Sequence, residues 1–227
     1  MKTTMMRNSS VGDDWIVKMC EANPIKMLPD TVNPMFLTCP VRLSFPNLFV
    51  PQKPLNRDTD QAYYSTCILF PPSDLVDFDV LLTPWQNQME KDFSGIPPES
   101  LHVPFRDQKE KEKYDGYTPG SLFMTVKTKI KPAVVDYKRS PITDESRVYP
   151  GVWAIVCVNM YSFGMTMPIK GVGFGLISVF VITDDDELSG GGGLSDTQMQ
   201  GVTDGITVLS PKIDVPSGKT SLEDLFS

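Results

Sequence analysis

Short stretches in which apolar and polar residues alternate, each ended by proline or glycine, are the feature that most constrains this fold. The stretch 38–45 places Val41, Leu43 and Phe45 on one side and polar residues on the other, and Pro46 ends it. Alternation with a period of two is typical of a half-buried β-strand. The 20 prolines and 16 glycines of the chain also favour many short elements over long helices.

The same reading along the chain predicts a mainly β domain. Strands are expected at residues 38–45, 63–70, 121–130, 148–161 and 171–182. Between the second and third strands we expect two short helices, the first capped by Ser73 and the second begun by Thr83 and Pro84 with a capping box to Gln86. A further short helix is expected near residues 14–19. Because no strand–helix–strand rhythm appears, the pattern indicates a small antiparallel barrel with a helical insertion.

The charge of the chain is concentrated at its end. Residues 184–227 hold nine of the 28 acidic residues and only two of the 21 basic ones, so they carry the whole net charge of −7 and residues 1–183 are neutral. A glycine tract at residues 190–193 precedes a polar stretch with few large apolar residues. We therefore expect an N-terminal extension at residues 1–37, the barrel domain at 38–183 and a disordered acidic tail at 184–227.

Several classes of site are disfavoured by composition. Cys20, Cys39, Cys67 and Cys157 show no paired spacing and are expected to be reduced core residues, and His102 is the one histidine. We therefore expect neither a zinc site nor a Ser-His-Asp or Cys-His centre, and no cofactor, metal or enzymatic activity. No stretch has the roughly 18 apolar residues of a membrane span, and residues 1–10 do not resemble a signal peptide, so a location in the cytosol of the cell that makes the protein is expected.

Two motifs are weighed and set aside. Residues 171–175 read Gly-x-Gly-x-Gly, but no Gly-Lys-Ser/Thr follows and a strand is expected there, so the phosphate-loop interpretation is rejected. The acidic run 184–187 could bind a divalent metal as in nucleases. Its place beside the glycine tract makes charge repulsion and solubility the better interpretation.

The third expected strand carries the best chemical signal. Its alternation places Phe123, Lys127 and Lys129 on one face, opposite Leu122, Met124 and Val126. An aromatic ring beside lysines suits single-stranded nucleic acid, because any base can stack on the ring while the lysines contact phosphates. A solvated strand face with one stray phenylalanine remains the alternative.

Other candidates extend this face. Trp153, Tyr161 and Phe163 share the strand parity of Asn159 and could add stacking platforms, although core packing is the alternative. Arg42 and Tyr64, on the first two expected strands, are further candidates. A basic segment could form an electrostatic track, or simply a solvated loop. Its members are Lys127, Lys129, Lys131, Lys138, Arg139 and Arg147.

Taken in order, several segments resemble a family of phage single-stranded-DNA-binding proteins, formerly described as a phage domain of unknown function. The segments cover roughly residues 38–193. They are VRLSFPNLF at 41–49, YSTCILFP at 64–71, GYTPG at 116–120, KPAVVD at 131–136, VYPG at 148–151, KGVGFGL at 170–176, and the acidic step with its glycine tract.

The resemblance implies an OB fold, binding of single strands without sequence specificity, and a role in phage replication, recombination or repair. It also implies a tail that contacts replication or recombination proteins, for which the expected contacts are Leu222, Glu223, Asp224, Leu225 and Phe226. The extension of about 37 residues and the ending in Phe-Ser depart from the family pattern. Homo-oligomerisation is left open. The competing interpretations are a β-barrel assembly protein that ignores DNA and, third, a metal-dependent nuclease using the run 184–187.

Overall fold

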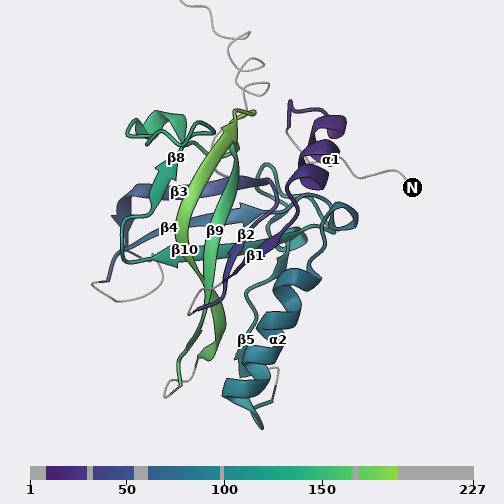
Figure 1. The fold of residues 1–227 in the computed structure, drawn as a ribbon, viewed down its shortest axis with the longest axis vertical. Helices are drawn as coiled ribbons and strands as arrows, with labels where there is room; N and C mark the ends of the chain where they lie inside the picture. The colour runs from purple at the N-terminus through teal and green to yellow at the C-terminus, as the bar shows by residue number, and fades with distance from the viewer. Residues whose placement is uncertain (1–8, 30–32, 54–60, 98–99, 166–168, 189–227) are drawn as a thin grey trace, which may run out of the picture. The chain divides into compact units, whose positions relative to one another are not determined.

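Ten strands and two α-helices make up the described part of the chain (Figure 1). The computed structural model describes residues 9–29, 33–53, 61–97, 100–165 and 169–188. The chain divides into two compact units, residues 1–193 and 194–227, and every described residue lies in the first. The predicted tail contacts at residues 222–226 lie outside the described residues.

Five strands form a closed ring of pairings. They are β3 (Val41–Gln52), β4 (Tyr63–Leu69), β7 (Leu122–Thr128), β10 (Lys170–Thr183) and β9 (Trp153–Phe163), which pairs back with β3. Neighbours in the ring are antiparallel, except that β7 and β10 run parallel. In chain order the ring reads first, second, third, fifth, fourth, which is the strand order of an OB fold. The predicted OB-type fold is confirmed.

The interior of the ring is the main core. Alternate residues of each strand point inward, and Leu43, Ile68, Val126 and Val158 have exposed fractions of 0%. Leu122, Met124 and Val126 face this core as predicted from their alternation, because Cβ positions alternate between the two faces of a strand. The third strand therefore presents Phe123, Thr125 and Lys127 to the outside.

Short strands extend the ring on both sides. β1 (Lys26–Leu28) pairs with β2 (Met35–Leu37), and β2 pairs with β9, so two segments of the predicted N-terminal extension belong to the sheet. β5 (Leu101–His102) and β8 (Ala133–Val135) pair with β10 on either side of its contact with β7. β6 (Arg106–Asp107) pairs with β7. Each of the five has two or three residues, too few for an alternating pattern to show.

The helices of the insertion begin at other residues than predicted, and the predicted cap at Ser73 is wrong because Ser73–Leu75 is only a short 3-10 helix without a side-chain cap. α1 (Asp13–Ala22) lies in the region where a short helix was expected, but the insertion after β4 is one helix, α2 (Asp79–Phe93), which contains Pro84. The predicted start of a second helix at Thr83 is wrong. Buried Leu81 and Phe93 lie on either side of the proline, and the Trp85 indole donates to the carbonyl of Val172 at 3.0 Å, so packing on the barrel holds one continuous helix.

Short 3-10 helices lie in the connections, at η1 (Ser73–Leu75), η3 (Gln108–Lys111) and η4 (Glu145–Arg147). None of the helices in the described ranges is long and apolar enough to cross a membrane. In Figure 1 the β9–β10 hairpin runs vertically and crosses β3 and β4 steeply, so the outer surface of the ring is built from strands of several orientations.

Candidate nucleic-acid interface

The outer face of β4 and β7 has a covered end and an open end. Directly opposed residues share a face, and the outward pairs are Leu69 with Phe123, Cys67 with Thr125, and Ser65 with Lys127. Phe123 is 1% exposed and Leu69 0%, whereas Ser65 and Lys127 are half-buried. Residues on the same outward face are therefore buried at one end of the strand pair and partly accessible at the other.

The covered end is a second, smaller core. It joins residues from α1, from β4, β7 and β9, from the loop before β7 and from the segment after β10: Ile16, Cys20, Leu69, Tyr117, Phe123, Trp153 and Leu188. Trp15 packs edge-on against Trp153 with ring centroids 5.4 Å apart, and Tyr117 does the same against Phe123 at 5.5 Å. A base cannot stack on a ring that is already enclosed. The prediction of Phe123 and Trp153 as stacking platforms is therefore wrong, because remote segments cover an outward face that the strand pattern leaves open.

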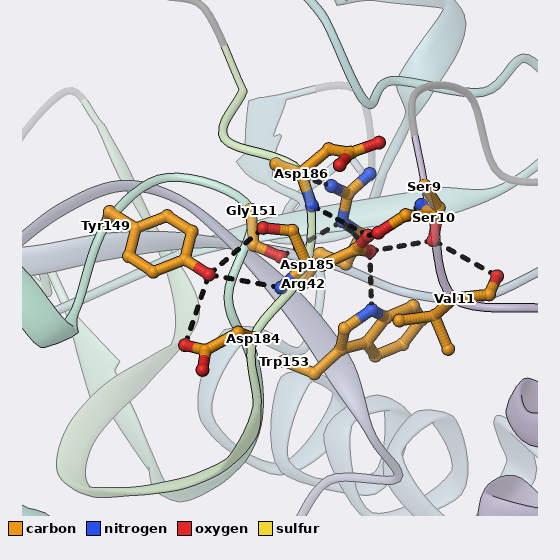
Figure 2. A network of polar contacts seen from close by, with 10 residues as sticks. All are labelled: Ser9, Ser10, Val11, Arg42, Tyr149, Gly151, Trp153, Asp184, Asp185 and Asp186. Atoms are coloured by element: carbon orange, nitrogen blue, oxygen red, sulfur yellow. Dashed lines mark hydrogen bonds and ion pairs between the residues drawn. The ribbon is translucent and has the colours of Figure 1, made fainter.

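Arg42 is held in the same region by a buried polar network (Figure 2). Its side chain is 0% exposed; Nε donates to the carbonyl of Gly151 at 3.1 Å and pairs with Asp185 Oδ2 at 3.2 Å, and an Nη donates to the carbonyl of Asp186 at 2.8 Å. The guanidinium of Arg42 therefore binds the segment that follows β10. The prediction that Arg42 contacts DNA is wrong, because none of its surface is accessible to a phosphate.

Asp185 is the acceptor at the centre of this network. Trp153 Nε1 and the Ser9 hydroxyl each donate to Oδ2 at 2.7 Å, and the backbone N–H of Ser10 donates to Oδ1 at 2.7 Å. Burial alone would raise the pKa of this carboxyl, but the hydrogen bond from Ser9 and the charge of Arg42 outweigh it, and the pKa lies below its usual value. The second residue of the acidic run is therefore structural, and because Leu188 is buried in the second core, residues 184–188 belong to the domain rather than to a tail.

This network gives a pH-dependent prediction. Because the pKa of Asp185 is lowered on folding, its contribution to stability is present above the unfolded value of about 3.9 and is lost as pH falls through the folded pKa. We expect Asp185→Asn to lower the free energy of unfolding at pH 7 by about 1–3 kcal/mol, since the amide cannot accept from every donor. The difference from the unmodified chain should shrink below about pH 4.

Urea unfolding at several pH values measures this difference. Asp186→Asn is the matched control, because the Asp186 contact to Arg42 is made by its backbone carbonyl; it should change stability by less than about 0.5 kcal/mol. Equal losses in the two variants, or a pH-independent loss in Asp185→Asn, would show that the pair with Arg42 contributes nothing specific.

The open end of the face is built on glycine. Gly171, Gly173 and Gly175 occupy the outward positions of β10, opposite Phe163, Tyr161 and Asn159 of β9. A Cβ on Gly173 would lie 3.4 Å from the Phe163 ring and 3.6 Å from the Tyr161 ring. Both rings therefore lie across the glycine backbone and are half-buried, with their centroids 6.0 Å apart. His102 continues the row, 5.7 Å from Phe163.

A lysine lies beside these rings. Lys127 Nζ sits 4.8 Å from the centre of the Tyr63 ring, and Lys127 is the β7 partner of Gly175. Tyr63 lies on β4, Lys127 on β7, and Asn159, Tyr161 and Phe163 on β9, with the glycines of β10 between the last two strands, and all five residues are half-buried. We call these five residues the open face. Rings on a glycine floor with an ammonium among them are the components of a stacking platform for single strands.

A smaller aromatic group lies nearer the covered end. Phe45 is 40% exposed, has a φ of +50°, and meets Tyr114 edge-on at 5.6 Å. Lys111 Nζ lies 5.5 Å from the Phe45 ring and 5.0 Å from the Phe123 ring. Positive φ is uncommon for a bulky residue, and such strain often accompanies a functional position. The side chain here is presented to solvent by the bulge between Ser44 and Asn47 of β3.

The remaining predicted residues fall in three places. Lys127 and Tyr161 lie on the open face. Tyr64 is half-buried with the inward parity of Thr66 and Ile68, so it does not share the face of Tyr63. Beyond the end of β7, in the segment around β8, lie the exposed Lys129, Lys131, Lys138, Arg139 and Arg147. Tyr137 in that segment is 72% exposed, with Lys138 Nζ 5.4 Å from its ring.

The sequence prediction named Tyr161 and Phe163 as possible stacking platforms but missed Tyr63 and the aromatic group at Phe45. It also missed the part of Gly171, Gly173 and Gly175, which form no phosphate loop, as predicted, but leave the outward face of β10 as bare backbone under the rings of β9. In the described part of the chain no three His, Cys, Asp or Glu side chains gather as a metal site would need.

Comparisons with known proteins show the family of the chain. A family model described as the ssDNA-binding protein of Enterobacter phage Enc34 matches residues 35–204. A putative protein p50 of Acyrthosiphon pisum secondary endosymbiont phage 1 is 32% identical over 162 residues, which cover 67% of this chain and 85% of the relative.

Solved structures extend the likeness to the fold. The single-stranded-DNA-binding protein of bacteriophage Enc34 in complex with ssDNA superposes with a TM-score of 0.53 at 19% identity, over 71% of this chain and 98% of that one. A second structure of the Enc34 protein gives a TM-score of 0.53 at 18% identity, over 77% of this chain and 99% of the other.

Proposed function

The chain belongs to the family of the Enterobacter phage Enc34 ssDNA-binding protein, and on that premise we propose that it binds single-stranded DNA on the open face, without sequence preference. The observation that carries the proposal is the group of half-buried rings and one lysine on the glycine floor of β10. In OB folds the face of the second and third strands, with the loops between strands 1 and 2 and between strands 4 and 5, is the usual surface for oligonucleotides. Here those strands are β4 and β7, which contribute Tyr63 and Lys127.

Each group has a distinct part in binding. Bases stack on Tyr161 and Phe163, whose faces accept any base, so the contact is tolerant of sequence. Lys127, whose Nζ lies over the Tyr63 ring, contacts a phosphate. Phe45 with Lys111 extends the path toward one side, and the exposed lysines around β8 extend it toward the other. The path therefore crosses the strands of the ring.

Salt dependence tests the electrostatic part. We expect the affinity for oligo-dT to fall with salt, at a slope of about −0.7 for each phosphate neutralised. Lys127→Ala should weaken binding and reduce the magnitude of that slope by about 0.7. Lys91→Ala, an exposed lysine in the last turn of α2, should leave the slope unchanged. Fluorescence anisotropy at several salt concentrations measures both; a slope unchanged by Lys127→Ala would remove this lysine from the interface.

The acidic C-terminal residues are proposed to compete with DNA and to recruit partners. Beyond Leu188 the chain carries five acidic and two basic residues and ends in the group Leu222, Glu223, Asp224, Leu225 and Phe226. Tethered acids reach a high effective concentration at a basic site, so they compete with phosphates most strongly at low salt. DNA binding then releases the end of the chain to contact replication or recombination proteins of the phage in the host cytoplasm.

Truncation tests this competition, provided that it spares the domain. Removing all residues after Leu188 keeps Asp185 with Arg42 and keeps Leu188 in the second core, whereas a truncation at Asp184 would remove both. We expect the chain ending at Leu188 to bind oligo-dT several-fold more tightly at low salt, with the difference shrinking as salt rises. Equal affinities at low salt would leave the acidic residues with a role in solubility alone.

A further inference from the structure

Asn159 occupies one end of a polar row across the open face. Its β10 partner is Gly175, the β7 partner of Gly175 is Lys127, and the β4 partner of Lys127 is Ser65. Neighbouring strands lie about 4.8 Å apart, so the row places the Asn159 amide about 10 Å from the lysine, two strands away. This is within the space that a bound nucleotide would span between its base and its phosphate.

The amide of Asn159 differs from those of the other half-buried asparagines in the described ranges. The amides of Asn23 and Asn47 each donate to a backbone carbonyl, at 3.1 and 3.3 Å. No hydrogen bond among the described residues engages the Asn159 side chain, and no buried side-chain nitrogen or oxygen there lacks a partner, so its polar atoms are open to solvent. A half-buried amide with free hydrogen-bonding capacity in a stacking site is placed for a ligand.

Gly175 fixes where that amide lies. A Cβ at residue 175 would lie 2.4 Å from Asn159 Oδ1 and 3.5 Å from the Tyr161 ring. The amide and the ring therefore share the space above the same glycine, two residues apart on one face of β9. A base stacked on Tyr161 would present its edge toward the amide.

We propose that Asn159 contacts the edge of the base stacked on Tyr161 and that its amide is the reason this contact tolerates every base; the inference rests on the proposed function. An amide offers one donor and one acceptor side by side, and rotation about its terminal bond exchanges them. Each of the four bases presents an adjacent donor and acceptor on its Watson–Crick edge. One residue can thus satisfy any base, which adds affinity without imposing sequence preference.

Replacing the amide nitrogen of Asn159 by an oxygen should give this contact a preference among bases. Asn159→Asp leaves a carboxylate that only accepts hydrogen bonds. Cytosine offers its exocyclic amino group, for which a carboxylate is a good acceptor, whereas the N–H of thymine is flanked by two carbonyl oxygens that repel it. The variant should therefore weaken binding to oligo-dT more than to oligo-dC, and the ratio of dC to dT affinity should rise at least about fivefold over that of the unmodified chain.

Ser65→Asp is the matched control for charge, because it puts a carboxylate in the same row on the far side of Lys127. It should lower both affinities by one factor and leave their ratio unchanged. Asn159→Ala should also lower both without changing the ratio. If Asn159→Asp behaves like Ser65→Asp, the base-edge contact is overturned while DNA binding stands. If the unmodified chain binds neither oligonucleotide, the proposed function itself fails.

Discussion

The double variant Tyr161→Ala/Phe163→Ala is expected to weaken binding to oligo-dT by about 2–6 kcal/mol, because each stacked base contributes about 1–3 kcal/mol. Both rings lie across the glycine floor of β10, so their removal leaves bare backbone at the two positions where bases are proposed to stack. Since the rings are half-buried on the outside of the barrel, the main core is untouched and the variant should remain folded. Anisotropy with a labelled oligo-dT measures the loss.

Tyr137→Ala is the control for this variant. Tyr137 is the more exposed aromatic residue, at 72%, and lies beside Lys138 in the segment around β8. Its removal should weaken binding by less than about 1 kcal/mol, because a peripheral ring without a supporting floor orders a base poorly. A larger loss from Tyr137→Ala than from the double variant would move the binding site from the open face to that segment.

Phe123→Ala is expected to lower the free energy of unfolding by about 3–5 kcal/mol, as for other large-to-small changes in a core. The ring is 1% exposed, packs edge-on against Tyr117, and is covered by Arg106 and Lys111 with the guanidinium carbon and Nζ at 5.2 and 5.0 Å. The affinity of the folded fraction for oligo-dT should be retained. Urea unfolding and anisotropy at a temperature where both proteins are folded separate the two effects.

Thr125→Ala is the control on the same strand and the same face. Thr125 is exposed, two residues from Phe123, so its replacement should change stability by about 0.5 kcal/mol or less. A Phe123→Ala variant with full stability and weakened DNA binding would mean that the second core opens in solution and that Phe123 is a stacking residue.

The contrast between Phe123 and Lys127 shows what the sequence could predict. Their common face follows from the period of a strand, and the structure bears it out through the pairs of β7 with β4. Phe123 is enclosed by Ile16 on α1 and by Leu188 after β10, each more than 60 positions away in the sequence, and neither residue covers Lys127. Strand periodicity contains no information about such remote cover.

Arg42 and Asp185 illustrate the same limit for charge. Arg42 lies in a strand whose alternation suggests a solvated side, and Asp185 lies in a run of four acids. Their pairing requires the end of β10 to return to the start of β3, which only the closed ring brings about. The acidic charge of residues 184–227 follows from the sequence alone, but the sequence does not show that the carboxylate of Asp185 is buried and pairs with Arg42.

The glycines of β10 were the most informative residues of the site. Gly173 and Gly175 alternate with buried Val172, Phe174 and Leu176, so the segment satisfies the period of a strand as well as the spacing of a loop motif. That the glycines support Tyr161 and Phe163 depends on the β9 register, in which Tyr161 is opposite Gly173. Register between distant strands is set by the assembled core and is not visible in either segment alone.

Ultraviolet crosslinking of the chain to oligo-dT, followed by mass spectrometry of the crosslinked peptides, tests the central claim most directly. If single-stranded DNA crosses the open face, crosslinks should concentrate at Tyr63, Tyr161 and Phe163, and excess unlabelled oligo-dT should abolish them. Crosslinks confined to Tyr137 and the neighbouring segment around β8, with none in β4 or β9, would contradict it.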